Sequence, residues 1–451
     1  MLLMIQKALN SASGTGIDFC LSSKMANQIE LWSRMYGNRP PWRSDTVETM
    51  GLPAAIAGEI ARLVTLELQT ECKGSARAVY INTVYQKVLK NLRIYTEYGC
   101  AKGGLIFKPY PSSGGVEVQV IQADYFFPVS FDNAGRITQC VFLDQFRRGD
   151  KIFSRIEMHE LRGETLTVTN RAYLATNDFS LGSEISLGMV DVWSELVPVI
   201  SFTGVSRIPF GYFKVPLANE DDPVSPIGVS VYSHAVGQIR EADRRYSQLN
   251  WEFDAKEAAV HISQSLLRQN PQTQQDEYPQ GKERLYRAVE YNVGATDKPL
   301  LDTFSPDIRD QSYLNGLNAQ LRLVEFSCSL AYGTLSDPDN VDKTAEEIKT
   351  SKQRSYQMVS DTQMALQMAL EDMLQAVDFY CDVYGLAPSG AYTVTFKWDD
   401  SIIVDAEKER MTDRADVSMG VMSLAEYRAK WYGETPEEAA KKVQQPAGVI
   451  E

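Results

Sequence analysis

The sequence predicts a mainly helical α+β fold, and two features carry that prediction. Short runs of β-branched and aromatic residues, separated by turn residues, are concentrated in residues 105–202. Two long stretches, Gln238–Asn270 and Lys343–Tyr384, contain neither Gly nor Pro and keep apolar residues at helical spacing. At about 1.5 Å per residue they could form helices of roughly 50 and 60 Å. A chain of 451 residues, 44% of them hydrophobic, is expected to form two or three domains.

The first hundred residues are expected to be mostly helical. Apolar residues three or four apart predict one helix over 52–68, with Pro53 near its start, and another over 82–98, stopped by Gly99 and then by Gly103–Gly104. An antiparallel meander should follow, because turn signals such as Asp132–Gly135 separate the β runs. Its strands are expected at 105–107, 116–121, 125–131, 137–145, 151–161, 165–173 and 197–202.

Proline and capping residues mark the later helices. Ser225–Pro226 and Ser305–Pro306 each place an N-cap residue before a proline, and Thr344 with Glu347 forms a capping box. A short strand is expected over 284–292 and another over 392–398. Two helices should close the chain, opened by Ser423 with Glu426 and by Thr435–Pro436 with Glu438.

The longest helical stretch is unevenly polar. Its first half, Glu346–Gln357, is nearly all polar, and a lone helix with that half exposed would be marginal. We therefore expect this half to pack against copies of itself or to line a wet space. The preceding Gly333–Asp342 can only be a loop.

The charge balance is acidic, with a formal net charge of −14. The whole chain should repel DNA rather than grip it, because phosphate affinity comes from Lys and Arg. Six well-separated cysteines form no C-x-x-C pair, which signals neither a zinc site nor a disulfide framework. No stretch reaches the roughly 18 apolar residues of a membrane span, and the start lacks a signal-peptide pattern. These patterns predict a protein made and kept in a cytoplasm.

The search for catalytic motifs finds none. Only three histidines occur, and no phosphate-binding glycine loop, dinucleotide fingerprint or nucleophile elbow is present. Asp337, Asp339 and Asp342 share one loop, which leaves a divalent-cation site open, although their spacing matches no full ligand loop. We expect no catalytic residue, no metal and no cofactor.

Five segments, in order, resemble the portal proteins of tailed bacteriophages, and in particular the portal group of long-tailed phages of Gram-positive hosts. The likeness covers most of the chain between about residues 30 and 443. The segments are Gly228–Phe253, Ser305–Arg309, Leu330–Ser336, Lys343–Ile348 and Met422–Arg428.

The resemblance implies a portal-like subunit with a wing, a two-helix stem, an inserted clip, a tunnel loop, a long kinked helix and a crown. Carried over, the parts are a wing of 1–225 with a strand return at 385–404, stem helices 226–262 and 305–332, a clip 263–304, a tunnel loop 333–343, a long helix 344–384 and a crown 405–451.

A portal is a structural protein and not an enzyme. The resemblance implies a homo-oligomeric ring of twelve subunits, or thirteen when isolated, at the capsid vertex of the virion, assembled in the host cytoplasm. Its implied partners are the terminase large subunit, the head–tail adaptor, and the major capsid and scaffolding proteins. Double-stranded DNA would be translocated through the ring without sequence-specific contacts, and no membrane partner is implied. An adaptor or minor capsid protein is the first alternative, and a metal-dependent enzyme the second.

Three sets of residues are candidate sites. The mixed charges of the stem suggest that Arg240, Arg244 and Arg245 form inter-subunit ion pairs. The polar clip suggests a partner-binding surface at Gln272, Gln274 and Gln275, since a surface serving two partners in turn should avoid a large apolar patch. The tunnel loop would face the DNA channel through Thr334, Leu335, Ser336, Asp337, Asp339, Asn340 and Lys343.

Overall fold

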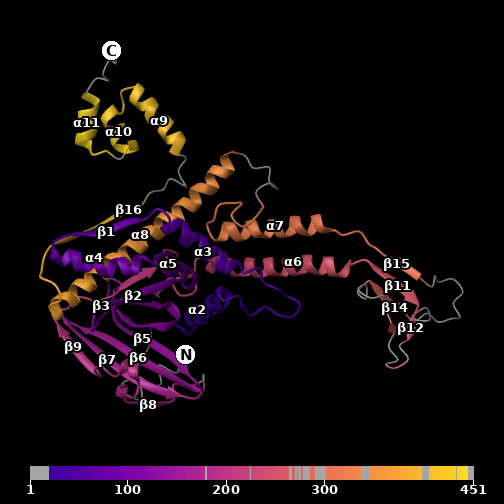
Figure 1. Ribbon diagram of the computed structural model, residues 1–451, viewed down its shortest axis with the longest axis horizontal. Helices are drawn as coiled ribbons and strands as arrows, with labels where there is room; N and C mark the ends of the chain where they lie inside the picture. The colour runs from indigo at the N-terminus through magenta and orange to yellow at the C-terminus, as the bar shows by residue number, and fades with distance from the viewer. Residues whose placement is uncertain are drawn as a thin grey trace.

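The structure is a computed structural model, and it describes residues 20–177, 180–223, 225–263, 267–269, 272, 276–277, 285–289, 301–337, 345–398, 406–432 and 434–444. Figure 1 shows three parts: a body of helices and sheets, a pair of helices that leads to a small sheet, and a helical cluster at the C-terminal end. The fold is mixed α+β with antiparallel sheets, as the sequence predicts.

Four helices form one side of the body. They are α2 (Ser23–Tyr36), α3 (Leu52–Thr65), α4 (Ala76–Leu89) and α5 (Leu92–Lys102). In α2, the Ser22 hydroxyl accepts a hydrogen bond from the Met25 amide at 3.2 Å, and the helix buries an apolar stripe at three- and four-residue spacing.

The predicted helix over 82–98 is wrong in two respects. The chain breaks between Leu89 and Leu92 into α4 and α5, and Gly99 lies inside α5 rather than ending it. A Cβ on Gly99 would lie 2.5 Å from a ring carbon of Phe213, so the glycine is needed for close packing. The helix ends at Gly103, whose φ of 90° is left-handed.

The predicted antiparallel strands are confirmed, but they form two sheets rather than one meander. A six-stranded antiparallel sheet has the order β4-β5-β6-β7-β8, with β9 paired to β7, and a three-stranded sheet has the order β10-β2-β3. The strands are β2 (Gly104–Ser112), β3 (Gly115–Gln122), β4 (Phe126–Phe131), β5 (Ile137–Arg148), β6 (Lys151–Arg162), β7 (Thr165–Ala175), β8 (Ser183–Ile185), β9 (Val199–Thr203) and β10 (Gly211–Lys214).

The longest helix, α8 (Ala345–Tyr384), runs into the body, where it packs on β10, β2, α3 and α4 (Figure 1). The predicted apolar set of its second half is buried, including Leu370, Leu374 and Val377 at 0% exposure. After α8 the chain forms β16 (Tyr392–Lys397), which pairs with β1 (Gln69–Gly74). The strand β1 carries only one buried residue, so its pattern gives no strand signal.

A buried arginine fixes the C-terminal end of α8. Arg77 on α4 is 2% exposed and donates to the Asp378 carboxylate at 2.9 Å, the Asp378 carbonyl at 3.1 Å and the Asp382 carboxylate at 2.6 Å. Its Nε donates to the Pro388 carbonyl at 3.1 Å. A cation at this end satisfies free carbonyls and complements the helix dipole.

The paired helices α6 (Val236–Ala255) and α7 (Asp310–Ser327) are shorter than predicted. Ser225–Pro226 opens a buried extended segment instead of a helix, because the Val231 amide bonds the Cys100 carbonyl at 3.0 Å. Beyond α6, Val260 and Ile262 join a strand rather than continuing the helix.

The small sheet lies at the far end of α6 and α7 (Figure 1). Its strand β11 pairs in parallel with β14 and antiparallel with β15, which confirms the strand predicted over 284–292. The strands here are β11 (Ala259–Ser263), β12 (Arg268–Gln269), β13 (Asp276–Glu277), β14 (Tyr286–Val289) and β15 (Leu301–Phe304).

Both capping boxes at the C-terminal end are confirmed. The Ser423 amide donates to the Glu426 carboxylate at 2.8 Å, and the Ser423 hydroxyl accepts from the Glu426 amide at 3.2 Å. In the same way the Thr435 amide donates to the Glu438 carboxylate at 3.2 Å, and the Thr435 hydroxyl accepts from the Glu438 amide at 3.3 Å. The helices are α10 (Leu424–Tyr432) and α11 (Pro436–Gln444), preceded by α9 (Ala406–Ser418), which the sequence analysis did not separate.

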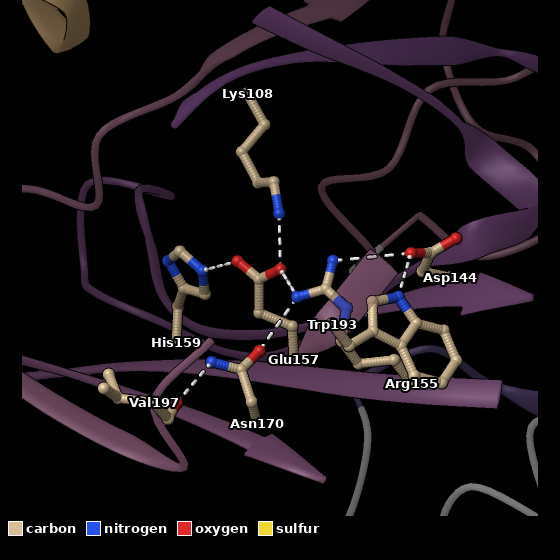
Figure 2. Close-up of polar contacts among 8 residues, drawn as sticks. All are labelled: Lys108, Asp144, Arg155, Glu157, His159, Asn170, Trp193 and Val197. Atoms are coloured by element: carbon tan, nitrogen blue, oxygen red, sulfur yellow. Dashed lines mark hydrogen bonds and ion pairs between the residues drawn. The ribbon is translucent and has the colours of Figure 1, made fainter. Parts of the chain in front are cut away.

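A buried ion network joins the two sheets (Figure 2). Lys108 on β2 reaches across to Glu157 on β6, with Nζ 2.5 Å from Oε2. The same carboxylate accepts from Arg155 Nη1 at 2.7 Å and bonds His159 Nε2 at 2.6 Å, while Arg155 also donates to Asn170 at 2.9 Å. At its edge Asp144 accepts from the indole of Trp193 at 3.0 Å; Trp193 belongs to the 3₁₀ turn Asp191–Trp193.

The network keeps Glu157 charged and His159 neutral. Burial alone would raise the pKa of Glu157, but Lys108, His159 and Arg155 hold it well below its usual range. Burial lowers the pKa of His159 in spite of its bond to Glu157. The imidazole therefore donates through Nε2–H, and the cluster stabilises the contact between the two sheets.

Replacing Glu157 alone should destabilise the body strongly. In Glu157→Gln, Lys108 and Arg155 would remain as buried cations facing a neutral group, and the free energy of unfolding should fall by about 3–5 kcal/mol. Urea unfolding followed by tryptophan fluorescence measures this. The double variant Lys108→Met, Glu157→Gln removes both charges, and its free energy of unfolding should fall by less. An equal loss in both variants would mean that the charge pairing is unimportant.

The network also predicts acid sensitivity. A folded-state pKa of His159 below 6.5 means that the unfolded chain binds the proton first, so stability should fall as pH drops below about 6.5. Glu157, whose pKa is also depressed, adds a further loss below about 4.5. His159→Gln keeps an N–H donor without titrating, so its unfolding midpoint should change less than that of the parent between pH 7 and pH 5.5. Identical pH profiles would contradict this assignment.

Candidate functional site

The helices α6 and α7 run antiparallel and are joined by hydrogen bonds along their length. Arg245 donates to the Gly316 carbonyl at 2.7 Å, and Nε2 of the Gln320 side chain donates to the Gln238 carbonyl at 3.2 Å. Large apolar side chains nevertheless point outward from both helices, with Trp251 70% and Leu323 54% exposed. The pair is thus internally bonded but leaves apolar surface uncovered.

An ion pair holds the two helices where the small sheet begins. The Arg309 guanidinium donates to both oxygens of Glu252, at 3.1 and 2.9 Å, and the Arg309 amide donates to the same carboxylate at 3.3 Å. These bonds from Arg309 lower the pKa of Glu252. Because Arg309 is the residue before α7, the pair fixes where the returning helix starts.

A loop from the N-terminal region braces the other half of α6. The buried Asp243 carboxylate accepts from the Trp42 indole at 2.8 Å and from the Met50 amide at 3.0 Å. Burial raises the pKa of Asp243, against the lowering effect of these two bonds. The Ser247 hydroxyl accepts from the Glu48 amide at 2.9 Å. Residues 42–50 therefore fix α6 to the body.

The three arginines predicted for subunit contacts do not share one environment. Arg240 and Arg244 are exposed, and Arg244 lies 3.8 Å from Glu241 of its own helix. Arg245 instead bonds α7 within the same chain. Only the first two therefore present their guanidinium groups on the outer surface.

The segment after α7 folds back around a buried carboxylate. Glu325, at 0% exposure, accepts hydrogen bonds from the amides of Gly333 at 3.1 Å, Leu335 at 2.6 Å and Ser336 at 2.8 Å. The Ser336 hydroxyl donates to the second carboxylate oxygen at 2.8 Å. Over the described part of the chain no Lys or Arg pairs with Glu325, so backbone dipoles and one hydroxyl stabilise its charge.

This carboxylate decides where the predicted tunnel-loop residues lie. Ser336 is buried and Leu335 half-buried, so neither side chain stands free on the surface. Thr334 is exposed but its hydroxyl bonds the Ala331 carbonyl, and the Asp337 amide bonds Asn318 at 2.8 Å. Asp339, Asn340 and Lys343 lie outside the described residues, as does the predicted N-cap Thr344.

The N-terminal half of α8 contacts this same region. The Arg354 guanidinium lies 4.5 Å from the ring centre of Phe326 on α7 and 5.9 Å from that of Tyr332. Such cation–π contacts give part of the polar half of the helix a partner within its own chain. The expectation that this half packs only against other copies or lines a wet space is therefore too simple.

The predicted partner-binding glutamines are placed only in part. Gln272 is an exposed turn residue between β12 and β13, whereas Gln274 and Gln275 lie outside the described residues. The short strands β12 and β13 pair over two residues each. The sequence analysis identified this region as polar but not its strand pairing.

Sequence reasoning missed Glu325, Glu252 and Asp243. Each is an acidic residue inside a helix, a position at which an acidic side chain usually faces solvent. For Glu325, its position in the sequence is the only signal of this role. It lies on the last turn of a helix, shortly before a Gly–Thr–Leu–Ser segment whose backbone amides are free to donate. Such a segment favours a buried carboxylate as the acceptor that anchors it.

Within the described ranges no three His, Cys, Asp or Glu residues are grouped to hold a metal ion. The six cysteines are free thiols, five of them buried, and burial raises the pKa of Cys100 and Cys328. Among the described helices, none has the length and apolar character needed to cross a bilayer.

Removing the charge of Glu325 should loosen the loop it anchors. Glu325→Gln places an amide N–H₂ against backbone donors, and we expect a stability loss of about 2 kcal/mol. Hydrogen exchange at the amides of Gly333, Leu335 and Ser336 should become faster. Ser336→Ala removes a single bond and should give a smaller effect at the same amides. Unchanged exchange in Glu325→Gln would contradict the anchoring role.

Comparison with known proteins supplies the family. A search of curated proteins finds no match. A family model described as phage portal protein, SPP1 Gp6-like, matches residues 73–446, more than four-fifths of the chain, from β1 to the end of α11. The matched range includes α6, the small sheet, α7, the anchored loop and α8 in one continuous run. The chain therefore belongs to the SPP1 Gp6-like family of phage portal proteins.

Proposed function

We propose that this portal protein forms a ring of twelve subunits at the capsid vertex and that the ring is the channel for DNA during packaging and ejection. One observation carries the proposal: a chain of this family places two bonded antiparallel helices, a small terminal sheet and an anchored loop in succession. The family is structural and implies a homo-oligomeric ring in a phage capsid.

The uncovered surface of α6 and α7 supports ring formation. Trp251 and Leu323 are large apolar side chains that a neighbouring subunit could bury. Arg240 and Arg244, on the outer side of α6, are proposed to pair with carboxylates of that neighbour. With a charge of −14 per subunit, ring closure needs such opposite-charge contacts.

The parts of the subunit are assigned by the same proposal. The body is the wing, α6 and α7 are the stem, the β11–β15 region is the clip, residues from 333 open the tunnel loop, and α9–α11 form the crown. The clip, with Gln272, Gln274 and Gln275, would dock the terminase large subunit during packaging and the head–tail adaptor afterwards. The capsid and scaffolding proteins would surround the ring, and the phage would belong to the long-tailed group of Gram-positive hosts.

Native mass tests the ring. Mass photometry at moderate salt should show a species near 607 kDa, twelve times 50.6 kDa, or one subunit more. Arg244→Glu should reduce the ring fraction, most strongly at low salt, where screening is weakest. Arg136→Glu, an exposed reversal on the β4–β5 turn, is the matched control and should leave the ring intact. Equal ring yields for the two variants would refute the role of Arg244, and a parent that stays monomeric would count against the ring.

A further inference from the structure

A cleft in the body has a charge opposite to that of the chain. It encloses about 660 Å³ between the end of α3, the α4–α5 junction and the β1–β16 ribbon. Figure 1 shows these elements in the body, well away from the strands β11–β15. Four basic residues line it, Arg62, Lys90, Arg93 and Lys397, against the single carboxylate of Glu71.

Three of these cations are uncompensated. Arg62 donates to both oxygens of Glu59, at 2.8 and 2.6 Å, and Glu71 is paired with Lys73. Lys90, Arg93 and Lys397 are exposed, and among the described residues none of them forms an ion pair. In a chain of net charge −14, three unpaired cations lining one cleft make a local site for an anion.

The remaining lining fits a phosphate backbone. Gln69 and Gln86 add neutral side-chain amide donors, which commonly contact phosphate oxygens beside Lys and Arg. The lining has no aromatic side chain on which a base could stack, so recognition would not depend on base sequence.

An acidic peptide fits less well. An extended peptide gains much of its affinity by adding to a free strand edge. Here α4 packs on β1, and the Asn82 side chain accepts the hydrogen bond of the Cys72 amide at 3.1 Å. Because the Cys72 amide is already bonded, it cannot donate to a carbonyl of a peptide strand added at this edge.

We propose that this cleft binds the sugar–phosphate backbone of double-stranded DNA, without sequence preference. The proposal rests on the proposed function, since a portal is the setting that brings DNA to the subunit. Three phosphate contacts give a salt slope of about −2.7, or an affinity loss of about 40-fold between 50 and 200 mM salt.

Fluorescence anisotropy of a labelled 30-base-pair duplex tests the cleft on the purified full-length protein. The variant Lys90→Gln, Arg93→Gln, Lys397→Gln should lose at least tenfold in affinity at 50 mM salt, with a slope shallower by about 2.7. The control Arg136→Gln, Lys151→Gln, Arg162→Gln removes the same charge from three turns of the six-stranded sheet and should stay within about twofold. Equal losses in both triple variants would overturn the site in favour of bulk charge.

Two further readouts separate the explanations. Labelled poly-glutamate, tested with the same proteins, should bind weakly and independently of the cleft; if it alone loses binding in the cleft variant, the site is for acidic peptides and the proposal fails. Native mass of each variant reports the ring separately. An intact ring whose DNA affinity is unchanged in the cleft variant would refute the cleft and leave the proposed function standing.

Discussion

The burial of Arg77 against the C-terminal end of α8 is the interaction on which the body depends. A guanidinium that is 2% exposed needs full compensation, and it obtains it from Asp378, Asp382 and the Pro388 carbonyl. The contact ties α4 to the last turns of a forty-residue helix, which itself packs on β2, β10 and α3. Because α8 spans the body, fixing one of its ends positions sheets and helices that are distant in sequence.

The N-terminal half of α8 contacts α7 and the segment that follows it. Arg354 stacks on Phe326, one residue after Glu325, whose carboxylate holds the amides of residues 333–336. The single helix α8 thus connects the Arg77 contact in the body to the start of the loop that follows α7. Buried carboxylates at Asp243, Glu252 and Glu325 then fix the middle of α6, the start of α7 and the exit from α7 in turn. The two-helix arm is therefore set by three acidic residues, each paired with donors from another segment.

Much of the fold could be predicted because its signals are local. The strands of the sheets follow from turn residues and alternation, the two capping boxes from four residues, and α8 from a long run without Gly or Pro whose second half keeps apolar residues at helical spacing. The failures share one physical cause, which is that tertiary contacts overrode local preference. Gly99 reads as a helix stop but serves contact with Phe213, and β1 forms because β16 lies beside it, more than 300 residues later in the chain. No spacing rule places Glu325 among the amides of its loop, since the enclosing contacts depend on where the chain turns back.

Charge placement connects the buried and exposed halves of the molecule. Arg77, Lys108, Arg155 and Arg309 are each engaged with carboxylates in the interior or between helices, where removing one partner would leave an uncompensated charge. These cations serve stability and are not free to meet a polyanion. The proposed contact with DNA would instead use exposed cations, and among the described residues Lys90, Arg93 and Lys397 line one cleft without forming an ion pair. An acidic chain could in this way keep most of its surface repulsive to DNA and confine contact to a few positions per subunit, as the proposed conduit for a sliding polyanion would require.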